Sequence, residues 1–225
     1  MGLMTKSEVQ EAKKAHRQAK ADRKRKINTR NSRVSFLIVC EGERTEPNYF
    51  NALIDNRSSD VREVKIEGEG RGTVSLIKQT ISIRDKMDQE FDRVWAVFDK
   101  DSFLDFNDAI KLAGKNNILC AWSNESFELW YYLHFQFLET GVSRSQYIGM
   151  IEREIRRLTG NKDYKYEKKD PKTFSLLQKF GSEQMAIKHA EKLRHFFSDK
   201  NYTAHKPCTT VDLLVMELNE PEKLL

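Results

Sequence analysis

Two short acidic motifs are the residues of this sequence best suited to chemistry. Glu41 and Glu43 flank a glycine directly after an apolar run, and Asp99 and Asp101 flank a lysine after a second one. Hard carboxylate oxygens suit Mg²⁺ or Mn²⁺, which use a few carboxylates and bridge to substrate phosphates. Two carboxylates about 4 Å apart repel by roughly 4 kcal/mol at an effective dielectric constant of 20, so a proton or a metal ion must neutralise them. Either motif alone is also an ordinary helix cap or solvated turn, but two of them at two strand ends favour a metal site.

The acidic motifs lie in a segment where strand and helix patterns alternate. Short apolar runs, several of them β-branched, indicate buried strands, and runs with a helical apolar period separate them. The expected strands are 34–40, 61–67, 91–98 and 118–122, and the expected helices between them are 47–54, 73–87 and 103–113. This alternation predicts an α/β fold with an open, mainly parallel four-stranded sheet flanked by helices. Ligands of such a sheet bind at the carboxyl ends of its strands, where both acidic motifs are expected.

After residue 124 the strands stop and the sequence becomes helical in character. The expected helices are 127–137, 144–158, 173–180, 182–197 and 211–218. Residues 160–171 interrupt them with a lysine-rich loop that is expected at the surface. We therefore divide the chain into a basic amino-terminal arm over 1–32, an α/β core over 33–124 and a mostly helical carboxyl-terminal part over 125–225 packed on the core.

The basic character of the chain is concentrated in the arm. Residues 1–30 contain ten Lys or Arg residues against three acids, a local balance of +7, while the whole chain has a net charge of +5. The rest of the chain is therefore close to neutral. One interpretation is a phosphate-binding arm, whose affinity for nucleic acid would fall steeply with salt. The alternative is a solubilising extension.

The composition excludes some classes of protein. A hydrophobic fraction of 39% is enough for a folded core, so wholesale disorder is excluded. The longest apolar run, residues 36–40, is far shorter than the roughly 20 residues that a membrane span requires. The three cysteines are widely spaced without a CxxC pair, which favours reduced thiols and a cytoplasmic location.

Five segments of the sequence resemble the RloB-like family. They are LIVCEGERTEPNYF at 37–50, VWAVFDKD at 94–101, AWSN at 121–124, FELW at 127–130 and LHF at 133–135. The resemblance covers nearly the whole chain from Arg33. It implies a Toprim-type fold for the core, the metal-binding module also found in topoisomerases, primases and OLD-family nucleases. It also implies an association with restriction and phage-defence loci, and with abortive infection.

The resemblance also implies roles for individual residues. In the Toprim pattern a glutamate follows the first strand, which matches Glu41, and an Asp-x-Asp follows the third, which matches Asp99 and Asp101. Glu41 is then a general acid/base or metal ligand, and the two aspartates hold Mg²⁺ or Mn²⁺ against a phosphodiester. Glu43 and Glu128 are further candidates for metal ligands. The alternative for Glu128 is a charge at a helix start that complements the helix dipole.

One position departs from the family pattern. The family's Ser-Asn-Pro usually follows the fourth strand, and here Glu125 replaces the proline. We expect the local turn to differ for that reason, and Glu125 is a possible source of a further carboxylate.

The acidic motifs and the resemblance together predict a Mg²⁺-dependent, Toprim-type nuclease that hydrolyses nucleic-acid phosphodiesters. The expected role in phage defence is implied by the resemblance alone. The predicted substrate contacts are basic residues near the site and in the arm, namely Arg44, Arg71, Lys100, Lys24, Arg25 and Lys26. The substrate is DNA or RNA, with tRNA as one candidate, and a partner ATPase is implied by analogy with related nucleases. One alternative is a non-catalytic module of the same fold that binds nucleic acid or senses an effector. Another is nucleotidyl transfer of the primase kind, which uses the same carboxylates.

Overall fold

The computed structural model describes residues 34–56, 61–68, 73–101 and 104–224, with residues 61–68 described by their backbone alone. The predicted basic arm, with Lys24, Arg25 and Lys26, lies outside the described residues, as does Arg71. In the part of the chain that is described, no helix is both long and apolar enough to cross a lipid bilayer.

The centre of the fold is an open parallel sheet. Its strands are β1 (Val34–Cys40), β2 (Val61–Gly68), β3 (Arg93–Lys100) and β4 (Leu119–Asn124), paired in the order β2-β1-β3-β4. All three pairings are parallel. Every residue of β1 is buried, as expected for a strand covered on both faces. The predicted α/β class, with an open parallel sheet flanked by helices, is confirmed.

The third strand ends two residues later than its sequence pattern predicts. The expected range was 91–98, and the observed strand runs to Lys100 because Asp99 and Lys100 continue the pairing with β4. At the other end, Asp92 lies before the strand and accepts hydrogen bonds from the backbone and hydroxyl of Ser35. Asp99 is therefore part of the sheet rather than of the turn that follows.

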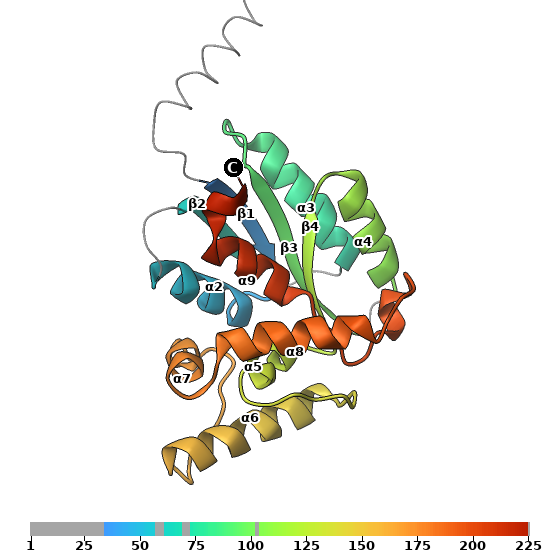
Figure 1. Ribbon diagram of the computed structural model, residues 1–225. Helices are drawn as coiled ribbons and strands as arrows, with labels where there is room; N and C mark the ends of the chain where they lie inside the picture. The colour runs from blue at the N-terminus through green and yellow to red at the C-terminus, as the bar shows by residue number, and fades with distance from the viewer. Residues whose placement is uncertain (1–33, 57–60, 69–72, 102–103, 225) are drawn as a thin grey trace, which may run out of the picture.

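Helices cover both faces of the sheet (Figure 1). The helix α2 (Thr45–Asp55) connects β1 to β2 and shares one hydrophobic cluster with α9 (Val211–Asn219). On the opposite face, α3 (Thr73–Lys86) and α4 (Phe106–Lys115) share a second cluster with β3 and β4. This division follows from right-handed crossovers, since the chain moves one way along the sheet from β1 to β2 and the other way from β2 to β3.

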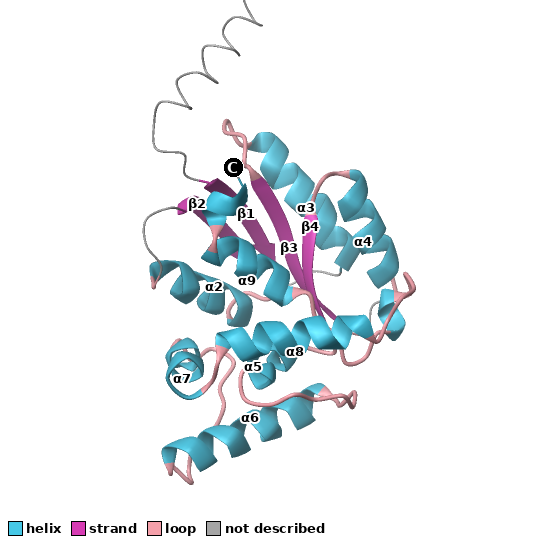
Figure 2. Cartoon of the chain, in the orientation of Figure 1, coloured by secondary structure: helices cyan, strands magenta, loops and turns pink. Residues whose placement is uncertain are grey.

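The remaining helices lie beyond the carboxyl ends of the strands (Figure 2). They are α5 (Glu128–Leu133), α6 (Arg144–Thr159), α7 (Lys172–Phe180) and α8 (Glu183–His195), with the short 3₁₀ helix η1 (Tyr202–Ala204). A second 3₁₀ helix, η2 (Pro221–Leu224), follows α9 and lies at the other end of the sheet, beside β1 (Figure 1). The expected helix over 127–137 is shorter than predicted because the carbonyl of His134 accepts a hydrogen bond from the amide of Ser182 instead of continuing the helix. The carboxyl-terminal half is helical, as predicted.

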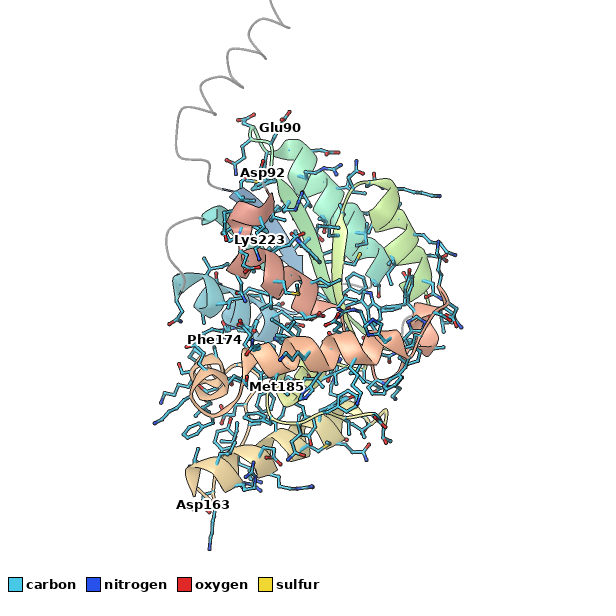
Figure 3. All side chains as sticks on the ribbon, viewed as in Figure 1. Glu90, Asp92, Asp163, Phe174, Met185 and Lys223 are labelled. Carbon is cyan, nitrogen blue, oxygen red and sulfur yellow. The ribbon has the colours of Figure 1, made fainter. Side chains whose placement is uncertain are left out.

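An aromatic cluster fixes these helices against the sheet. Tyr49 of α2 lies 5.7 Å from Phe127, 6.4 Å from Trp130 of α5 and 5.3 Å from Phe174 of α7, measured between ring centroids. Figure 3 shows Phe174 between α7 and α2. Edge-to-face contacts of this kind add to the hydrophobic energy of burying the rings. The cluster therefore holds α5 and α7 next to the carboxyl end of β1, where the acidic residues lie.

Candidate active site

Glu41 and Asp99 are joined at the carboxyl edge of the sheet. The backbone amide of Glu41 donates to the carbonyl of Val97 at 2.8 Å, so the pairing of β1 with β3 extends one residue beyond β1. The Oε2 atom of Glu41 then accepts a hydrogen bond from the backbone amide of Asp99 at 3.1 Å. The fold thus brings together two carboxylates from the two predicted motifs.

Glu41 has a strongly shifted pKa. Burial raises the pKa of Glu41 to about 7, the hydrogen bond from Asp99 opposes this, and the charges of Asp101 and Glu46 raise it further. A carboxyl group that titrates near neutral pH is well matched to proton transfer at that pH. The geometry therefore supports the acid/base role that the resemblance implies for Glu41.

Asp99 is nearly buried and forms an ion pair with Arg144. Its side chain is 13% exposed, and Nη2 of Arg144 donates to its Oδ2 at 3.2 Å. Burial raises the pKa of Asp99 well above its usual range, the charges of Glu46 and Glu128 add to this, and Arg144 opposes it. One half-exposed guanidinium therefore does not compensate the negative charge around Asp99.

The other half of the Asp-x-Asp motif lies where β3 ends. Asp101 follows the strand, is partly buried and acts electrostatically on Glu41. The ammonium of Lys100 donates to the backbone carbonyl of Asp101 at 2.6 Å, so this lysine folds over the turn. Asp101 thus belongs to the same electrostatic group as Glu41.

A second pair of acids lies behind the first. Glu46 in the first turn of α2 is 6% exposed, and Glu128 at the start of α5 is 2% exposed. Burial raises the pKa of Glu46, and the charge of Glu128 adds to this effect. Glu128 accepts a hydrogen bond from the hydroxyl of Tyr166 at 3.1 Å and pairs with Lys168 at 3.7 Å. Glu128 is also the first residue of α5, where a negative charge complements the helix dipole.

The glycine between Glu41 and Glu43 lies very close to the carboxylate of Glu46. A Cβ atom added at Gly42 would lie 2.1 Å from Oε2 of Glu46, far closer than any van der Waals contact. The close approach of Glu46 therefore explains why a glycine occupies the centre of the first motif.

Glu43 and Arg44 lie on the outer side of the same turn. Both side chains are exposed, and neither forms an ion pair or hydrogen bond with a described residue. The structure places Glu43 apart from the Glu41–Asp99 pair, whereas Glu128 lies within electrostatic range of Asp99.

Glu125 contributes to the turn rather than to the acidic group. Its φ angle of 75° is one that proline cannot adopt, because the proline ring fixes φ near −65°. Its carboxylate pairs with Lys206, and its carbonyl accepts a hydrogen bond from Arg144. The expected difference in the local turn is therefore present, and the additional carboxylate is engaged by a lysine.

The residues fit a magnesium ion in their chemistry, without forming a complete cage. Among the residues that the structure describes, no group of three or more acidic, histidine or cysteine side chains is arranged to hold a metal ion. Glu41 and Asp99 nevertheless provide two carboxylates at the carboxyl edge of the sheet, and neighbouring cations do not fully compensate their negative charge. Asp101 acts electrostatically on Glu41. Mg²⁺ commonly binds proteins through one or two carboxylates and completes its shell with water and substrate phosphates. The donor set matches that mode of binding.

Three residues of the site carry no clear signal in the sequence. Arg144, Tyr166 and Lys168 come from α6 and from the loop after it, and they approach the acids only in the folded chain. The lysine-rich character of the loop was visible, but nothing in it indicated a contact with Glu128. The loop is held in place because Thr45 donates to the carbonyl of Lys168 at 3.1 Å.

Comparison with known proteins gives one match. No curated protein and no solved structure matches the chain. A family model described as RloB-like protein matches residues 36–218. The matched range runs from β1 through most of α9 and includes all the acidic residues described above. The chain therefore belongs to the RloB-like protein family.

Proposed function

We propose that this protein is a Mg²⁺-dependent nuclease with a Toprim-like fold that hydrolyses nucleic-acid phosphodiesters. The observation that carries the proposal is the Glu41–Asp99 pair at the carboxyl edge of the sheet, where burial and neighbouring acids raise the pKa of both carboxyl groups. Strongly shifted titratable groups concentrate at functional sites. A glutamate after β1 and an Asp-x-Asp at the end of β3 are also the arrangement that the Toprim resemblance implies.

The proposed chemistry divides the roles between the two motifs. Bound Mg²⁺, held by Asp99 and Asp101, would polarise the scissile phosphate and lower the pKa of an attacking water. Glu41 takes up the proton, since its pKa of about 7 leaves it able to accept and return one near neutral pH. The amide of Asp99 fixes Oε2 of Glu41, so Oε1 is the oxygen that we assign to proton transfer.

Basic side chains next to the acids support a polyanionic substrate. The loop over residues 162–169, which we name the lysine strap, contains Lys162, Lys165, Lys168 and Lys169, all exposed. Thr45 and Asn48 donate to carbonyls of the strap at 3.1 and 3.4 Å and so hold it against the start of α2. Together with Arg44 and Lys100, the strap would contact backbone phosphates, which carry no base sequence information.

The remaining parts of the proposal rest on the family. A role in phage defence by abortive infection, and a partner ATPase, come from the resemblance alone. The proposed chemistry does not distinguish DNA from RNA, including tRNA, because each contains the same phosphodiester linkage.

A second candidate function is a non-catalytic module that binds nucleic acid. The observation in its favour is the ion pair between Arg144 and Asp99, because a protein cation already contacts the carboxylate that would hold the metal. Such a module would keep the basic surface and would need no divalent ion.

Cleavage assays separate the two functions. Labelled single-stranded DNA, double-stranded DNA and total tRNA are incubated with Mg²⁺, Mn²⁺ or EDTA, with the wild type, Glu41→Gln and Asp99→Asn. The control is Glu90→Gln, an exposed glutamate at the opposite end of the sheet (Figure 3). We expect metal-dependent cutting that both site variants abolish and the control retains.

The contrary results are equally specific. Salt-sensitive binding without cutting in any metal would support the binding module. Extension of a labelled strand that depends on nucleoside triphosphates would support nucleotidyl transfer.

A further inference from the structure

Arg144 connects the helical half of the molecule to the acidic edge of the sheet. It is the first residue of α6, and its Nη2 atom donates both to Oδ2 of Asp99 at 3.2 Å and to the carbonyl of Glu125 at 3.1 Å. No other described cation forms an ion pair with Asp99. The side chain therefore lies directly against the carboxylate that we assign to the metal.

The arginine is not needed to begin the helix. Ser143 precedes α6, and its backbone amide donates to the side chain of Gln146 at 2.8 Å in a capping box. Arg144 points away from that cap, toward the end of β3. Its contact with Asp99 is thus separate from the local structure of α6.

The guanidinium also has unused capacity for hydrogen bonding. Both of its bonds come from Nη2, so Nε and Nη1 have no partner among the described residues, and the side chain is 41% exposed. A guanidinium has five N–H donors in a planar fork that matches the geometry of a phosphate group. Arg144 therefore has donors available for a second anion while it lies at the site.

A metal ion and Arg144 would compete for the same carboxylate. A divalent cation bound to Asp99 would repel the guanidinium that now donates to Oδ2, because both carry positive charge. Arg144 also lowers the pKa of Asp99, Glu41 and Glu46 together, so its charge acts on the whole acidic group.

We propose that Arg144 is the counter-ion of Asp99 in the metal-free protein, that a divalent cation displaces it, and that the released guanidinium binds a phosphodiester of the substrate. This inference rests on the proposed function in that it takes the same carboxylate as the metal ligand. It adds a residue that pairs with Asp99 when no metal is bound and binds the substrate phosphate when metal is bound.

The first experiment measures metal binding without nucleic acid. Binding of Mn²⁺ and Mg²⁺ is followed by isothermal titration calorimetry for the wild type, Arg144→Gln and Arg144→Lys. Removing the competing charge should tighten metal binding about two- to fivefold in Arg144→Gln, the size expected for a partly exposed ion pair. Arg144→Lys keeps the charge and should bind metal nearly as the wild type does.

The second experiment measures substrate binding. Fluorescence anisotropy of labelled oligonucleotides is recorded over a salt series with Ca²⁺ present to limit cleavage. Arg144→Gln should weaken binding and reduce the slope of log affinity against log salt by about one, since one phosphate contact is lost. Arg144→Lys should recover part of the affinity.

The matched control is Arg93→Gln. Arg93 lies at the amino end of the same strand, pairs with Glu217 at 3.4 Å and has a similar side-chain exposure of 33%. This variant should leave both metal and oligonucleotide binding unchanged. Thermal unfolding of all variants verifies that each is folded.

Two results would overturn the inference. Weaker metal binding in Arg144→Gln would make the arginine a structural support of Asp99 rather than a competitor. If Arg144→Gln left both the oligonucleotide affinity and its salt dependence unchanged, Arg144 would not bind a substrate phosphate. Both readouts are binding constants, so a wild type that binds but does not cut would refute the proposed nuclease and leave the test of Arg144 intact.

Discussion

The acidic residues at the two ends of the parallel sheet differ in their hydrogen-bond and ion-pair partners. At the amino end, Asp92 accepts two hydrogen bonds of 2.8 Å from Ser35, and Figure 3 shows it away from the helical half. Glu217 accepts from the indole of Trp95 at 3.0 Å and pairs with Arg93 at 3.4 Å. Each of these two acids therefore has donors of its own.

At the carboxyl end, several acids share few cations. Among the described residues, the acids that act on one another are Glu41, Glu46, Asp99, Asp101 and Glu128. Arg144 pairs with Asp99, and Lys168 pairs with Glu128. Burying charge without full compensation costs stability. Burial also raises the pKa of Glu217 at the amino end, but its contacts with Trp95 and Arg93 oppose that shift. This difference supports our proposal of a metal site at the carboxyl end of the sheet.

The largest expected effect is on catalysis at the carboxyl end. Glu41→Gln keeps the shape of the side chain and its ability to accept from the amide of Asp99 but cannot take up a proton. Removing a general acid or base typically lowers a rate by about 10²- to 10⁴-fold. Single-turnover cleavage of a labelled oligonucleotide measures the loss. A rate within threefold of the wild type would contradict a catalytic role for Glu41. A factor of three corresponds to about 0.65 kcal/mol in activation free energy.

The next effect tests the packing behind the site. Gly42→Ala would place a methyl group against the buried carboxylate of Glu46 and should lower the free energy of unfolding by about 1–3 kcal/mol. Urea denaturation measures it. The double variant with Glu46→Ala should recover most of the loss, because the clash is then absent. The control Gly149→Ala has open space around its Cβ and should be neutral or slightly stabilising.

At the amino end we expect a stability effect without a catalytic one. Asp92→Ala removes the acceptor of two hydrogen bonds from Ser35 and should cost about 1–2 kcal/mol in the free energy of unfolding. The cleavage rate of the folded protein should not change. A loss of cleavage at unchanged stability would contradict the contrast between the two ends of the sheet.

The smallest effect concerns pH in the metal-free protein. The pKa of Glu41 is raised to about 7 in the folded state, so the folded protein holds a proton that the unfolded chain has released. Stability should therefore fall as pH rises from about 4.5 to 7 and then level off, lowering the melting temperature by a few degrees. Thermal unfolding in EDTA at pH 5 and pH 8 measures the trend.

Two comparisons sharpen the pH experiment. Glu41→Gln should show a weaker dependence, and Mg²⁺ should raise the melting temperature more at pH 8 than at pH 5, because the carboxylates must be deprotonated to bind it. A melting temperature that rises with pH in EDTA, in the wild type, would contradict the shift of Glu41.

The sequence predicted the features that depend on neighbours along the chain. The apolar run before Glu41 predicted a buried parallel strand, and the same reasoning predicted β3. The observed β3 runs two residues further than predicted and includes Asp99. The meeting of Glu41 and Asp99 then followed, because parallel strands expose their carboxyl ends at one edge. Even the helical character of the second half was readable from its apolar period.

Other features depended on contacts between distant segments, and only the tertiary structure decided them. Arg144 reaches Asp99 across 45 positions, and Tyr166 reaches Glu128 across 38. The need for glycine at position 42 arises from Glu46, which turns back over it when α2 begins two residues earlier than predicted. Local patterns fix which segments become strands and helices, because propensity and apolar period act over a few residues. Which cation meets which buried acid is set by the packing of whole elements, and it has no counterpart in the spacing of the sequence.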